Sequence, residues 1–359
     1  MHVPVQLGAR SYTIVVEAGG LAKLGDHLRP LGLGSKTALV VDPMTRRLYG
    51  ETVVESLRSA GFSVAVIEVP EGEAAKTLGV AARCWDELLA ARLDRSSTVL
   101  ALGGGAVGDL AGFVSATYMR GMNFVQLPTT VLAQVDASAG GKTAIDHPRA
   151  KNLIGAFHQP RFVLVDPLVV RTLPEREFRS GLAEMVKHGI VLDATYFDEM
   201  DRGASRLLAR DPETLERLIG GSCRLKAAVV ERDEHEAELR MVLNYGHTIG
   251  HALEAVINYG RWTHGEAVAV GIVAEARLAL RLGIAPVDVV ERQERLLAAL
   301  GLPTRVGTID ADAVLAAIGR DKKARDGRIP FVLAPAIGQF RLVYDVTADQ
   351  VRAALGEVA

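Results

Sequence analysis

Hydrophobic and polar positions divide the chain into two parts with different patterns. In the first part, short apolar runs of strand length alternate with segments of helical periodicity. The strand-like runs cover two alternating stretches within residues 1–20, then residues 36–42, 62–69, 96–105, 124–130 and 162–167, with helical segments at about 44–60 and 76–93. Strands that alternate with helices at this spacing predict a parallel sheet with right-handed crossover connections.

The pattern changes from about Glu175 onward. Long segments rich in Ala, Leu, Glu and Arg have helical periodicity, at residues 181–192, 212–234, 243–258, 265–283 and 287–300. Two apolar runs near the C-terminal end, FVLAPAIG and FRLVYDV, predict strands. We therefore expect an α/β domain over residues 1–174 and a mostly α-helical domain over residues 175–359, with the boundary near Pro174.

The composition narrows the class of protein. The 359 residues are 49% hydrophobic, which is enough for a large buried core and excludes a disordered chain. With 41 Lys and Arg against 43 Asp and Glu, the net charge of −2 argues against nucleic acid or a membrane surface as partner. The chain has only two cysteines, no signal-peptide pattern, and no apolar stretch of the ~18 residues that a membrane span needs. These features predict a cytoplasmic protein.

Glycine is over-represented, with 36 residues making up about 10% of the chain against a usual value of about 7%. Gly103, Gly105 and Gly108 match G-x-G-x-x-G directly after a predicted strand. Such glycines let the backbone approach a pyrophosphate at the start of a helix. The acidic residue expected about 20 residues later is missing. The cluster is therefore either a tight strand-to-helix turn or a dinucleotide site of different layout, in which Asp42 holds a ribose hydroxyl.

A second cluster, DASAGGKT at residues 136–143, ends like a nucleotide-binding P-loop. The first glycine that a P-loop requires is replaced by Asp136, so the pattern disfavours ATP or GTP hydrolysis. Lys142 beside two flexible glycines is nevertheless a candidate site for an anion such as phosphate.

Histidines and a glutamate in the second part predict a metal site. His247 and His251 lie one helical turn apart, His264 follows in the motif HGEAV, and Glu184 lies in a predicted helix. Three His or Glu ligands with one open position are typical of catalytic zinc. Spacing alone pairs His247 with His251. The alternative is that these histidines are hydrogen-bonded members of an ordinary core.

Basic residues are frequent near the same segments: Lys142, Lys151, Lys187, Lys226, Arg240 and the pair Lys322 and Lys323. For any single lysine a solvated surface position is the simpler interpretation. Lys187 and Lys226 are stronger candidates because they interrupt apolar helical runs. A metal, a nucleotide and an anionic substrate together indicate redox chemistry at a carbinol beside a phosphate or carboxylate.

Seven longer segments together resemble the 3-dehydroquinate synthase family. They are GGGAVGDLAGF (103–113), TYMRG (117–121), PTTVLAQVDASAGGKT (128–143), KNLIGAFHQP (151–160), GLAEMVKHG (181–189), LNYGHTIGHALE (243–254) and HGEAVAVG (264–271). The resemblance extends over about residues 36–340. The family is one of the sugar phosphate cyclases, which are related in fold to iron-dependent alcohol and glycerol dehydrogenases.

The resemblance implies a dehydroquinate synthase-like fold, with an N-terminal Rossmann-like α/β domain that binds NAD. A helical C-terminal domain would bind the substrate and a divalent metal, usually zinc, with cobalt as a possible substitute. It further implies a homodimer with a site in the cleft between the domains. The implied reaction converts 3-deoxy-D-arabino-heptulosonate 7-phosphate into 3-dehydroquinate and phosphate, in the shikimate pathway. NAD would be reduced and reoxidised within each turnover, around a phosphate elimination that precedes an intramolecular aldol.

The resemblance also implies roles for individual residues. The metal ligands would be Glu184, His247 and His264, and His251 would face the substrate instead. The substrate contacts would be Asp136, Lys142, Asn152, Lys187, Lys226, Arg240, Asn244 and His251, one or both of Lys322 and Lys323, and Arg120 of the partner subunit. Among these, Lys226 and Arg240 would bind the carboxylate. The NAD contacts would be Asp42, Glu73, Lys76, Gly104, Gly105, Asp109, Thr129, Thr130, Lys142, Lys151, Thr172 and Glu177.

Three alternatives stay open at this point. A sister cyclase would make a valiolone or a deoxy-inosose from a sugar phosphate without a carboxylate. A metal-dependent polyol dehydrogenase would release NADH. A catalytically silent binding protein would have no need for the metal, glycine and lysine sets together.

Overall fold

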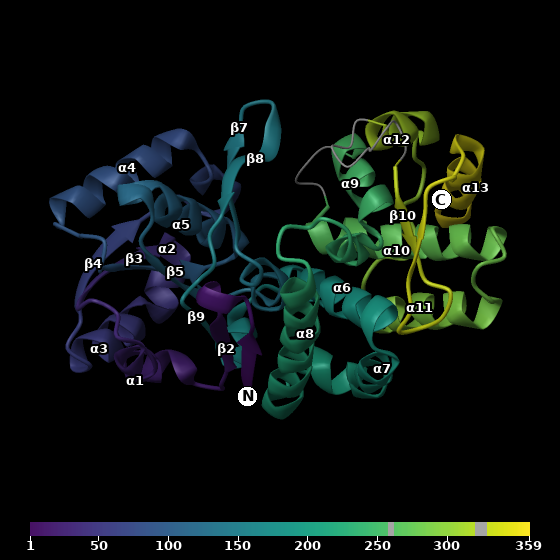
Figure 1. Cartoon of the computed structure of the whole chain (residues 1–359). Helices are drawn as coiled ribbons and strands as arrows, with labels where there is room; N and C mark the ends of the chain where they lie inside the picture. Colours follow the sequence, from purple (N-terminus) through teal and green to yellow (C-terminus); the bar gives the residue numbers. More distant parts are fainter. Residues whose placement is uncertain (258–261, 320–328) are drawn as a thin grey trace. The chain divides into compact units, whose positions relative to one another are not determined.

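A computed structural model describes residues 1–257, 262–319 and 329–359 (Figure 1). The chain divides into two compact units. Unit 1 comprises Met1–Leu173 and Lys226–His235, and unit 2 comprises Pro174–Leu225 and Glu236–Ala359. The division is therefore not simply N-terminal against C-terminal, because one later segment belongs to unit 1.

Unit 1 is built on a seven-stranded sheet in the order β1-β2-β9-β6-β5-β3-β4. β1 pairs antiparallel with β2, and the other neighbouring strands run parallel. The strands are β1 (His2–Val5), β2 (Tyr12–Val16), β3 (Lys36–Val41), β4 (Ser63–Glu68), β5 (Thr98–Gly103), β6 (Asn123–Pro128) and β9 (Phe162–Val165). All six residues of β5 are buried, as expected for a parallel strand covered on both faces. The predicted α/β class is confirmed.

Helices cover both faces of this sheet. They are α1 (Leu24–Leu28), α2 (Pro43–Thr45), α3 (Glu51–Ser59), α4 (Leu78–Ala90) and α5 (Gly105–Thr117). Figure 1 shows α4 and α5 on one side of the sheet and α1 and α3 on the other. Under α4 and α5, alternate residues of the central strands such as Val40 and Ala101 pack against Leu88, Leu110 and Val114.

The order of the strands creates a switch point between β3 and β5. From β3 the chain continues to β4 on one side, whereas β5 lies on the other side of β3. The register pairs Val41 with Leu102, so the next residues, Asp42 and Gly103, leave adjacent strands at the same edge. Ligands of open α/β sheets bind at such points, because the connections to neighbouring strands diverge there.

The sequence pattern predicted neither the short helix α1 nor a hairpin of β7 (Lys142–His147) and β8 (Ala150–Phe157). The sequence of β8 lacks the alternation of apolar and polar residues that predicts a strand, and its apolar residues Leu153, Ile154 and Phe157 are exposed. The hairpin is labelled beside α5 in Figure 1, and α5 packs against β7. The hairpin begins within the GGKT sequence of residues 140–143, and Lys142 is the first residue of β7.

Unit 2 is mostly helical, as predicted. Its helices are α6 (Glu175–Leu192), α7 (Ala194–Leu208), α8 (Pro212–Arg232), α9 (His247–Val256), α10 (His264–Arg281), α11 (Val287–Ala299), α12 (Ala311–Ile318) and α13 (Ala348–Val358), with a short antiparallel pair of β10 (Phe331–Leu333) and β11 (Arg341–Val343). The last residues of α8, from Lys226, belong to unit 1. α10 lies at the centre and packs against α6, α9, α11 and α13.

The helix predicted over residues 243–258 is interrupted. A 3-10 turn, η9 (Leu239–Asn244), precedes α9, and Gly246 between them has a left-handed backbone with φ of 77°. A residue with a side chain adopts this conformation only at a cost in free energy, so glycine is favoured there. As a result α9 begins at His247.

Glycines bring α6, α9 and α10 unusually close. A Cβ atom on Gly271 of α10 would lie 2.0 Å from the carbonyl oxygen of Gly246, and one on Gly265 would lie 1.8 Å from that of Ser180 in α6. These are backbone contacts, which cannot move aside as a flexible side chain can. The spacing of the three helices is therefore fixed by the absence of side chains.

No helix in the described ranges combines the length and apolar character needed to cross a membrane.

The helix spacing gives a direct stability test. Gly271→Ala forces a methyl group onto the backbone of Gly246, and we expect the free energy of unfolding to fall by about 1–3 kcal/mol. Gly356→Ala is the matched control, because Gly356 also lies in a helix, α13, but meets no atom within 4 Å. There the change should be neutral or raise stability by about 0.4–1 kcal/mol. Urea denaturation of both variants measures the difference, and equal stabilities would contradict the close-packing argument.

Candidate active site

Three side chains from three helices of unit 2 converge on one point. They are Glu184 on α6, and His247 and His264, which are the first residues of α9 and α10. The Nε2 atoms of His247 and His264 lie 3.2 Å and 3.5 Å from Glu184 Oε1. Glu184 is completely buried, yet no donor within the described ranges makes a well-aligned hydrogen bond to Oε1. A buried carboxylate oxygen in this state needs another partner.

The opposite nitrogen of each imidazole is already engaged. His247 Nδ1 lies 3.0 Å from the carbonyl oxygen of Tyr245, to which it can only donate. His264 Nδ1 lies 3.2 Å from Glu254 Oε2. Both contacts favour the tautomer with hydrogen on Nδ1, and this leaves the Nε2 lone pairs directed toward Glu184 as potential metal ligands.

The electrostatics of this cluster suit a bound cation. Burial opposes the charge of Glu184, but Lys187 and His247 hold its pKa well below the usual range. Burial lowers the pKa of His247. Burial also opposes a charge on His264, yet the carboxylates of Glu184 and Glu254 raise its pKa to about 10. Without a metal, a proton on His264 thus supplies positive charge that a divalent cation would otherwise bring.

His251 and Lys187 border the same cluster. The ring of His251 lies 5.1 Å from that of His247 and 5.7 Å from that of His264, and ligand atoms of the three histidines lie within 4.8 Å of one another. Lys187 is buried and donates to Glu184 Oε2. The structure therefore brings together the four residues that spacing and resemblance singled out. Which three bind a metal remains a prediction.

The first glycine cluster forms the turn from β5 into α5. A Cβ atom on Gly103 would lie 2.7 Å from Val107, and one on Gly108 would lie 2.8 Å from the side chain of Gln126 in β6. These two glycines thus serve the tight turn and the helix–strand packing. Gly104 is the N-cap of α5 and has no side chain to satisfy the first amide groups of the helix. Such amides can bind a phosphate group.

Asp42 has a structural task that the sequence did not reveal. It is the N-cap of α2, where its carboxylate accepts hydrogen bonds from the backbone N–H and the hydroxyl of Thr45, at 2.9 Å and 2.7 Å. The carboxylate still has acceptor capacity, because it has about four lone pairs. A ribose contact by Asp42 remains a prediction.

Several predicted NAD contacts gather around a buried lysine of unit 1. Lys76 Nζ donates to Asp109 Oδ2 at 2.8 Å and to Asn152, and it lies 3.7 Å from Glu73. Lys151 lies 3.8 Å from the same Glu73 oxygen. Burial opposes the charge on Lys76, but Asp109 and Glu73 raise its pKa above the ordinary value. This cluster places the ammonium group of Lys76, paired with carboxylates, close to the start of α5 and to the β7–β8 hairpin.

The second glycine cluster lies beside another buried ion pair. Lys226 Nζ is 2.6 Å from Asp136 Oδ1 and also contacts the backbone carbonyl of Asp136. Lys226 is buried, while Lys142, the first residue of β7, is exposed. Gly141, the residue before Lys142, has φ of 67°, and a Cβ atom there would lie 2.6 Å from the side chain of Gln159. The cluster therefore needs its glycine for a turn and for close packing.

The other predicted site residues are placed as follows. In unit 1, Thr129 donates its backbone N–H to Gly103 at 2.9 Å, and Thr130 packs against Gly104. Thr172 shares a 2.6 Å hydrogen bond with the hydroxyl of Tyr49, and Arg120 is exposed on the 3-10 turn η6 (Tyr118–Arg120) with φ of 66°. In unit 2, Arg240 is buried and Asn244 half-buried on η9, and Glu177 is exposed on α6. Lys322 and Lys323 lie outside the described residues.

Sequence reasoning missed the residues that support the histidines. Glu254 follows His247 by seven positions and His251 by three, so helical periodicity could have placed it on the same face of α9. Glu275 and the carbonyl of Tyr245 gave no such signal, because their contacts depend on how α9 and α10 pack.

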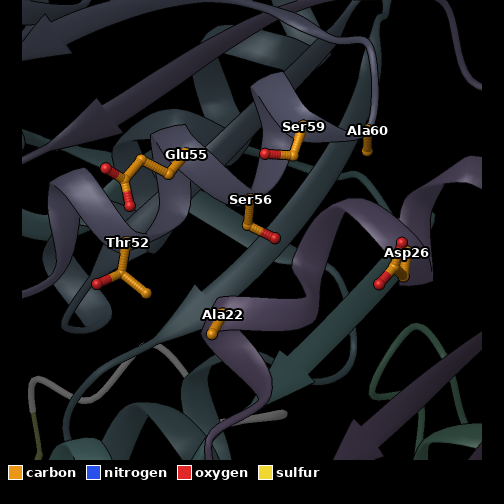
Figure 2. A pocket seen from close by; sticks show the side chains of 7 residues that line it. All are labelled: Ala22, Asp26, Thr52, Glu55, Ser56, Ser59 and Ala60. Atoms are coloured by element: carbon orange, nitrogen blue, oxygen red, sulfur yellow. The ribbon is translucent and has the colours of Figure 1, made fainter.

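A separate hollow of about 300 Å³ lies on unit 1 (Figure 2). It is lined by Ala22, Asp26, Thr52, Glu55, Ser56, Ser59 and Ala60. Ser56 Oγ accepts the backbone N–H of Gly25 at 3.0 Å and so links α3 to α1. None of the predicted site residues lines this hollow.

Comparisons with known proteins agree with this architecture. Models named 3-dehydroquinate synthase N-terminal and 3-dehydroquinate synthase C-terminal match residues 66–180 and 181–324. The chain is 47% identical to the 3-dehydroquinate synthase of Desulforamulus reducens, with 99% of each chain covered. It is 50% identical to that of Geobacter metallireducens, with 94% of each covered.

Solved structures of sugar phosphate cyclases are also similar. The 2-epi-5-epi-valiolone synthase of Streptomyces hygroscopicus subsp. jinggangensis, with NAD+ and Zn2+ bound, is 28% identical with a TM-score of 0.89, covering 97% of this chain and 96% of its own. A 2-deoxy-scyllo-inosose synthase complexed with carbaglucose-6-phosphate, NAD+ and Co2+ is 25% identical with a TM-score of 0.90 over the whole of both chains. The sequence identities to the two 3-dehydroquinate synthases are higher than those to the two cyclases of known structure, and the family models match residues in both units. The chain accordingly belongs to the 3-dehydroquinate synthase family.

Proposed function

We propose that this chain is a 3-dehydroquinate synthase. It would convert 3-deoxy-D-arabino-heptulosonate 7-phosphate into 3-dehydroquinate and phosphate, as an NAD- and metal-dependent lyase of the shikimate pathway. The observation that carries the proposal is the convergence of Glu184, His247 and His264, in a chain whose relatives bear this name at 44–50% identity. Membership of the family alone would not require an intact site.

The residues present fit a divalent metal. Zinc bonds of 2.0–2.2 Å in a tetrahedral arrangement put neighbouring ligand atoms roughly 3.3–3.6 Å apart. The two imidazole nitrogens lie at 3.2 Å and 3.5 Å from Glu184 Oε1. Glu184, His247 and His264 would hold the metal, and zinc is the expected ion, with cobalt as the substitute found in a similar structure. Three protein ligands leave a position for a substrate hydroxyl.

The residues of unit 1 fit NAD. The uncapped start of α5 at Gly104 and Gly105 offers amide groups to a pyrophosphate. It lies at the switch point of the sheet, where dinucleotides bind in this class of fold. Lys76 and Lys151 add positive charge to the same region, with Glu73 and Asp109 as partners. Thr129 and Thr130 follow the adjacent strand β6. Lys142, Thr172 and Glu177 are proposed as further NAD contacts because the resemblance to the family implies them.

When bound, NAD supplies a reversible hydride acceptor and the metal supplies Lewis-acid polarisation of a hydroxyl. The chain's own residues would bind and orient an anionic substrate. Lys226 and Arg240 would hold its carboxylate, while Lys142, Asn152 and Asn244 would lie near its phosphate. Lys187, Asp136, His251 and Lys322 complete the proposed substrate contacts. Few protein bases are needed, because the departing phosphate can itself take up a proton.

The choice among cyclases rests on the carboxylate. The valiolone and deoxy-inosose synthases are 28% and 25% identical to this chain, well below the curated 3-dehydroquinate synthases. Lys226 is buried and already paired with a carboxylate, that of Asp136. In the proposed complex a substrate carboxylate would accept a charge-assisted hydrogen bond from Lys226, and a substrate without a carboxylate would lack this contact.

The oligomeric state, the cellular location, the partners and the roles of the two parts of the chain belong to the same proposal. The enzyme would act as a homodimer in the cytoplasm, with Arg120 of the partner subunit contacting the substrate, and it would bind neither nucleic acid nor membrane. The net charge of −2 supports the absence of these two kinds of partner, and the two buried free cysteines support a reducing compartment such as the cytoplasm. Division of labour between an NAD-binding segment at 1–174 and a metal- and substrate-binding segment at 175–359 is likewise proposed.

Replacement of the histidines tests the metal ligands. His247→Ala should abolish turnover and remove most of the metal, because it deletes one of three ligands, while the chain stays folded. His251→Ala is the matched control from the same cluster. It should also lose turnover but keep its metal, since its proposed contact is with the substrate. Metal content by elemental analysis, with circular dichroism for folding, separates the two. Full metal retention in His247→Ala would refute the ligand assignment.

Lys226→Ala tests recognition of the carboxylate. The change removes a buried charge, and kcat/KM should fall by roughly 30- to 1,000-fold, equivalent to about 2–4 kcal/mol. Lys36→Ala, on the exposed start of β3, should stay within a few-fold of the parent. Steady-state kinetics with the heptulosonate phosphate measure both. An unchanged kcat/KM for Lys226→Ala would remove this residue from the site.

The reaction itself is tested by two simultaneous readings. The enzyme should release inorganic phosphate from 3-deoxy-D-arabino-heptulosonate 7-phosphate with no net formation of NADH, because the hydride is returned in each turnover. A chelator should stop phosphate release, and added Zn2+ or Co2+ should restore it. Steady accumulation of NADH would instead identify a polyol dehydrogenase. Activity with a sugar phosphate that has no carboxylate, and none with the heptulosonate, would identify a sister cyclase.

A further inference from the structure

We propose that Glu275, a buried carboxylate on α10, positions the proposed metal ligand His247 by capping the helix that begins with it. Glu275 is completely buried. Its Oε2 accepts the backbone N–H of Gly246 at 2.7 Å, and its Oε1 accepts that of Ile249 at 3.3 Å. The inference rests on the proposed role of His247 as a ligand.

The first turn of α9 lacks a cap of its own. A helix start leaves its first amide groups unsatisfied, and the N-cap side chain normally accepts one of them. Here the N-cap is Gly246, which has no side chain. A larger residue is excluded, because a Cβ atom would lie 2.5 Å from Ile272 Cγ1 and 3.0 Å from the carbonyl oxygen of Val268. The close approach of α9 and α10 therefore removes the usual cap.

Glu275 supplies that cap from the neighbouring helix. Gly271 of α10 is the residue that lies against Gly246, and Glu275 follows it by four positions on the same face. The absence of a side chain at Gly271 lets the backbones touch, and the carboxylate one turn later reaches the free amide groups. A carboxylate suits this place, because it can accept two hydrogen bonds and interacts favourably with the positive end of the helix.

The capped residues enclose the ligand. Gly246 precedes His247 and Ile249 follows it by two, so both hydrogen bonds of Glu275 hold the backbone from which the imidazole projects. The ring itself is fixed by the contact between Nδ1 and the carbonyl oxygen of Tyr245. Glu275 thus fixes the position of the His247 backbone, and the carbonyl of Tyr245 fixes the orientation of the imidazole ring.

The test is metal affinity rather than activity alone. Glu275→Gln keeps the shape of the side chain but replaces one acceptor oxygen by an NH2 group, which faces a backbone N–H. We expect the chelator-buffered affinity for Zn2+ to fall about 10- to 100-fold, as for other groups that support a ligand. The ligand-field absorption of the Co2+-loaded protein should also change, because the position of one ligand changes. Glu275→Asp, which keeps both acceptors on a shorter arm, should lose less affinity than Glu275→Gln.

Two controls make the outcome unambiguous. Leu278→Ala, at a fully buried position on the same helix, should lower the melting temperature but leave Zn2+ affinity within about two-fold. His247→Ala should lose high-affinity Zn2+ binding altogether. If Glu275→Gln binds Zn2+ as tightly as the parent while His247→Ala does not, the role of Glu275 is refuted and the ligand assignment stands. If His247→Ala keeps its Zn2+, the ligand assignment fails, and the role of Glu275 fails with it.

Discussion

The candidate metal centre depends on how closely three helices approach one another. α6, α9 and α10 contribute one proposed ligand each, so a change in their spacing would move the three side chains apart. That spacing is set by contacts between backbones, where Gly265 meets Ser180 and Gly271 meets Gly246. Close contact between backbones is rigid, because no side chain can rotate to relieve or loosen it. The proposed centre is thereby held by direct contacts between helix backbones.

The same solution recurs in unit 1 with a different purpose. Gly103 and Gly108 allow α5 to start immediately after β5 and to lie tightly on β6. The uncapped amide groups of α5 then face the edge of the sheet where β3 and β5 diverge. In unit 2 the free amide groups of α9 are satisfied by Glu275, whereas in unit 1 they remain available for a phosphate. Two similar helix starts thus differ: one is capped by a neighbouring carboxylate, and the other is the proposed binding site for a phosphate group.

The sequence predicted the architecture well because its signals are local. The run at residues 36–42 is apolar and β-branched, the run at 96–105 leads into glycines, and α10 has clear helical periodicity, so these strands and helices could be placed. The hairpin β7–β8 was missed, because its exposed apolar residues follow no period. At the site, the spacing of two histidines four positions apart favoured the pair His247 and His251. The resemblance to a family had already grouped Glu184 with His247 and His264, and the fold adds that Glu184 Oε1 lies 3.2 Å and 3.5 Å from their Nε2 atoms. The supporting carboxylate Glu275 could not be found from sequence, because its partners lie more than twenty positions away.

Both histidines proposed as metal ligands are the first residues of their helices, and this position has a consequence for the lifetime of the protein. Helix ends open more readily than helix centres, and opened segments are where proteases cut. A cation bound by His247 and His264 would tie two helix ends to the buried centre of α6 and so reduce their opening. Occupancy by the metal would then govern resistance to degradation as well as catalysis. A shortage of zinc would lower the amount of enzyme in addition to its activity.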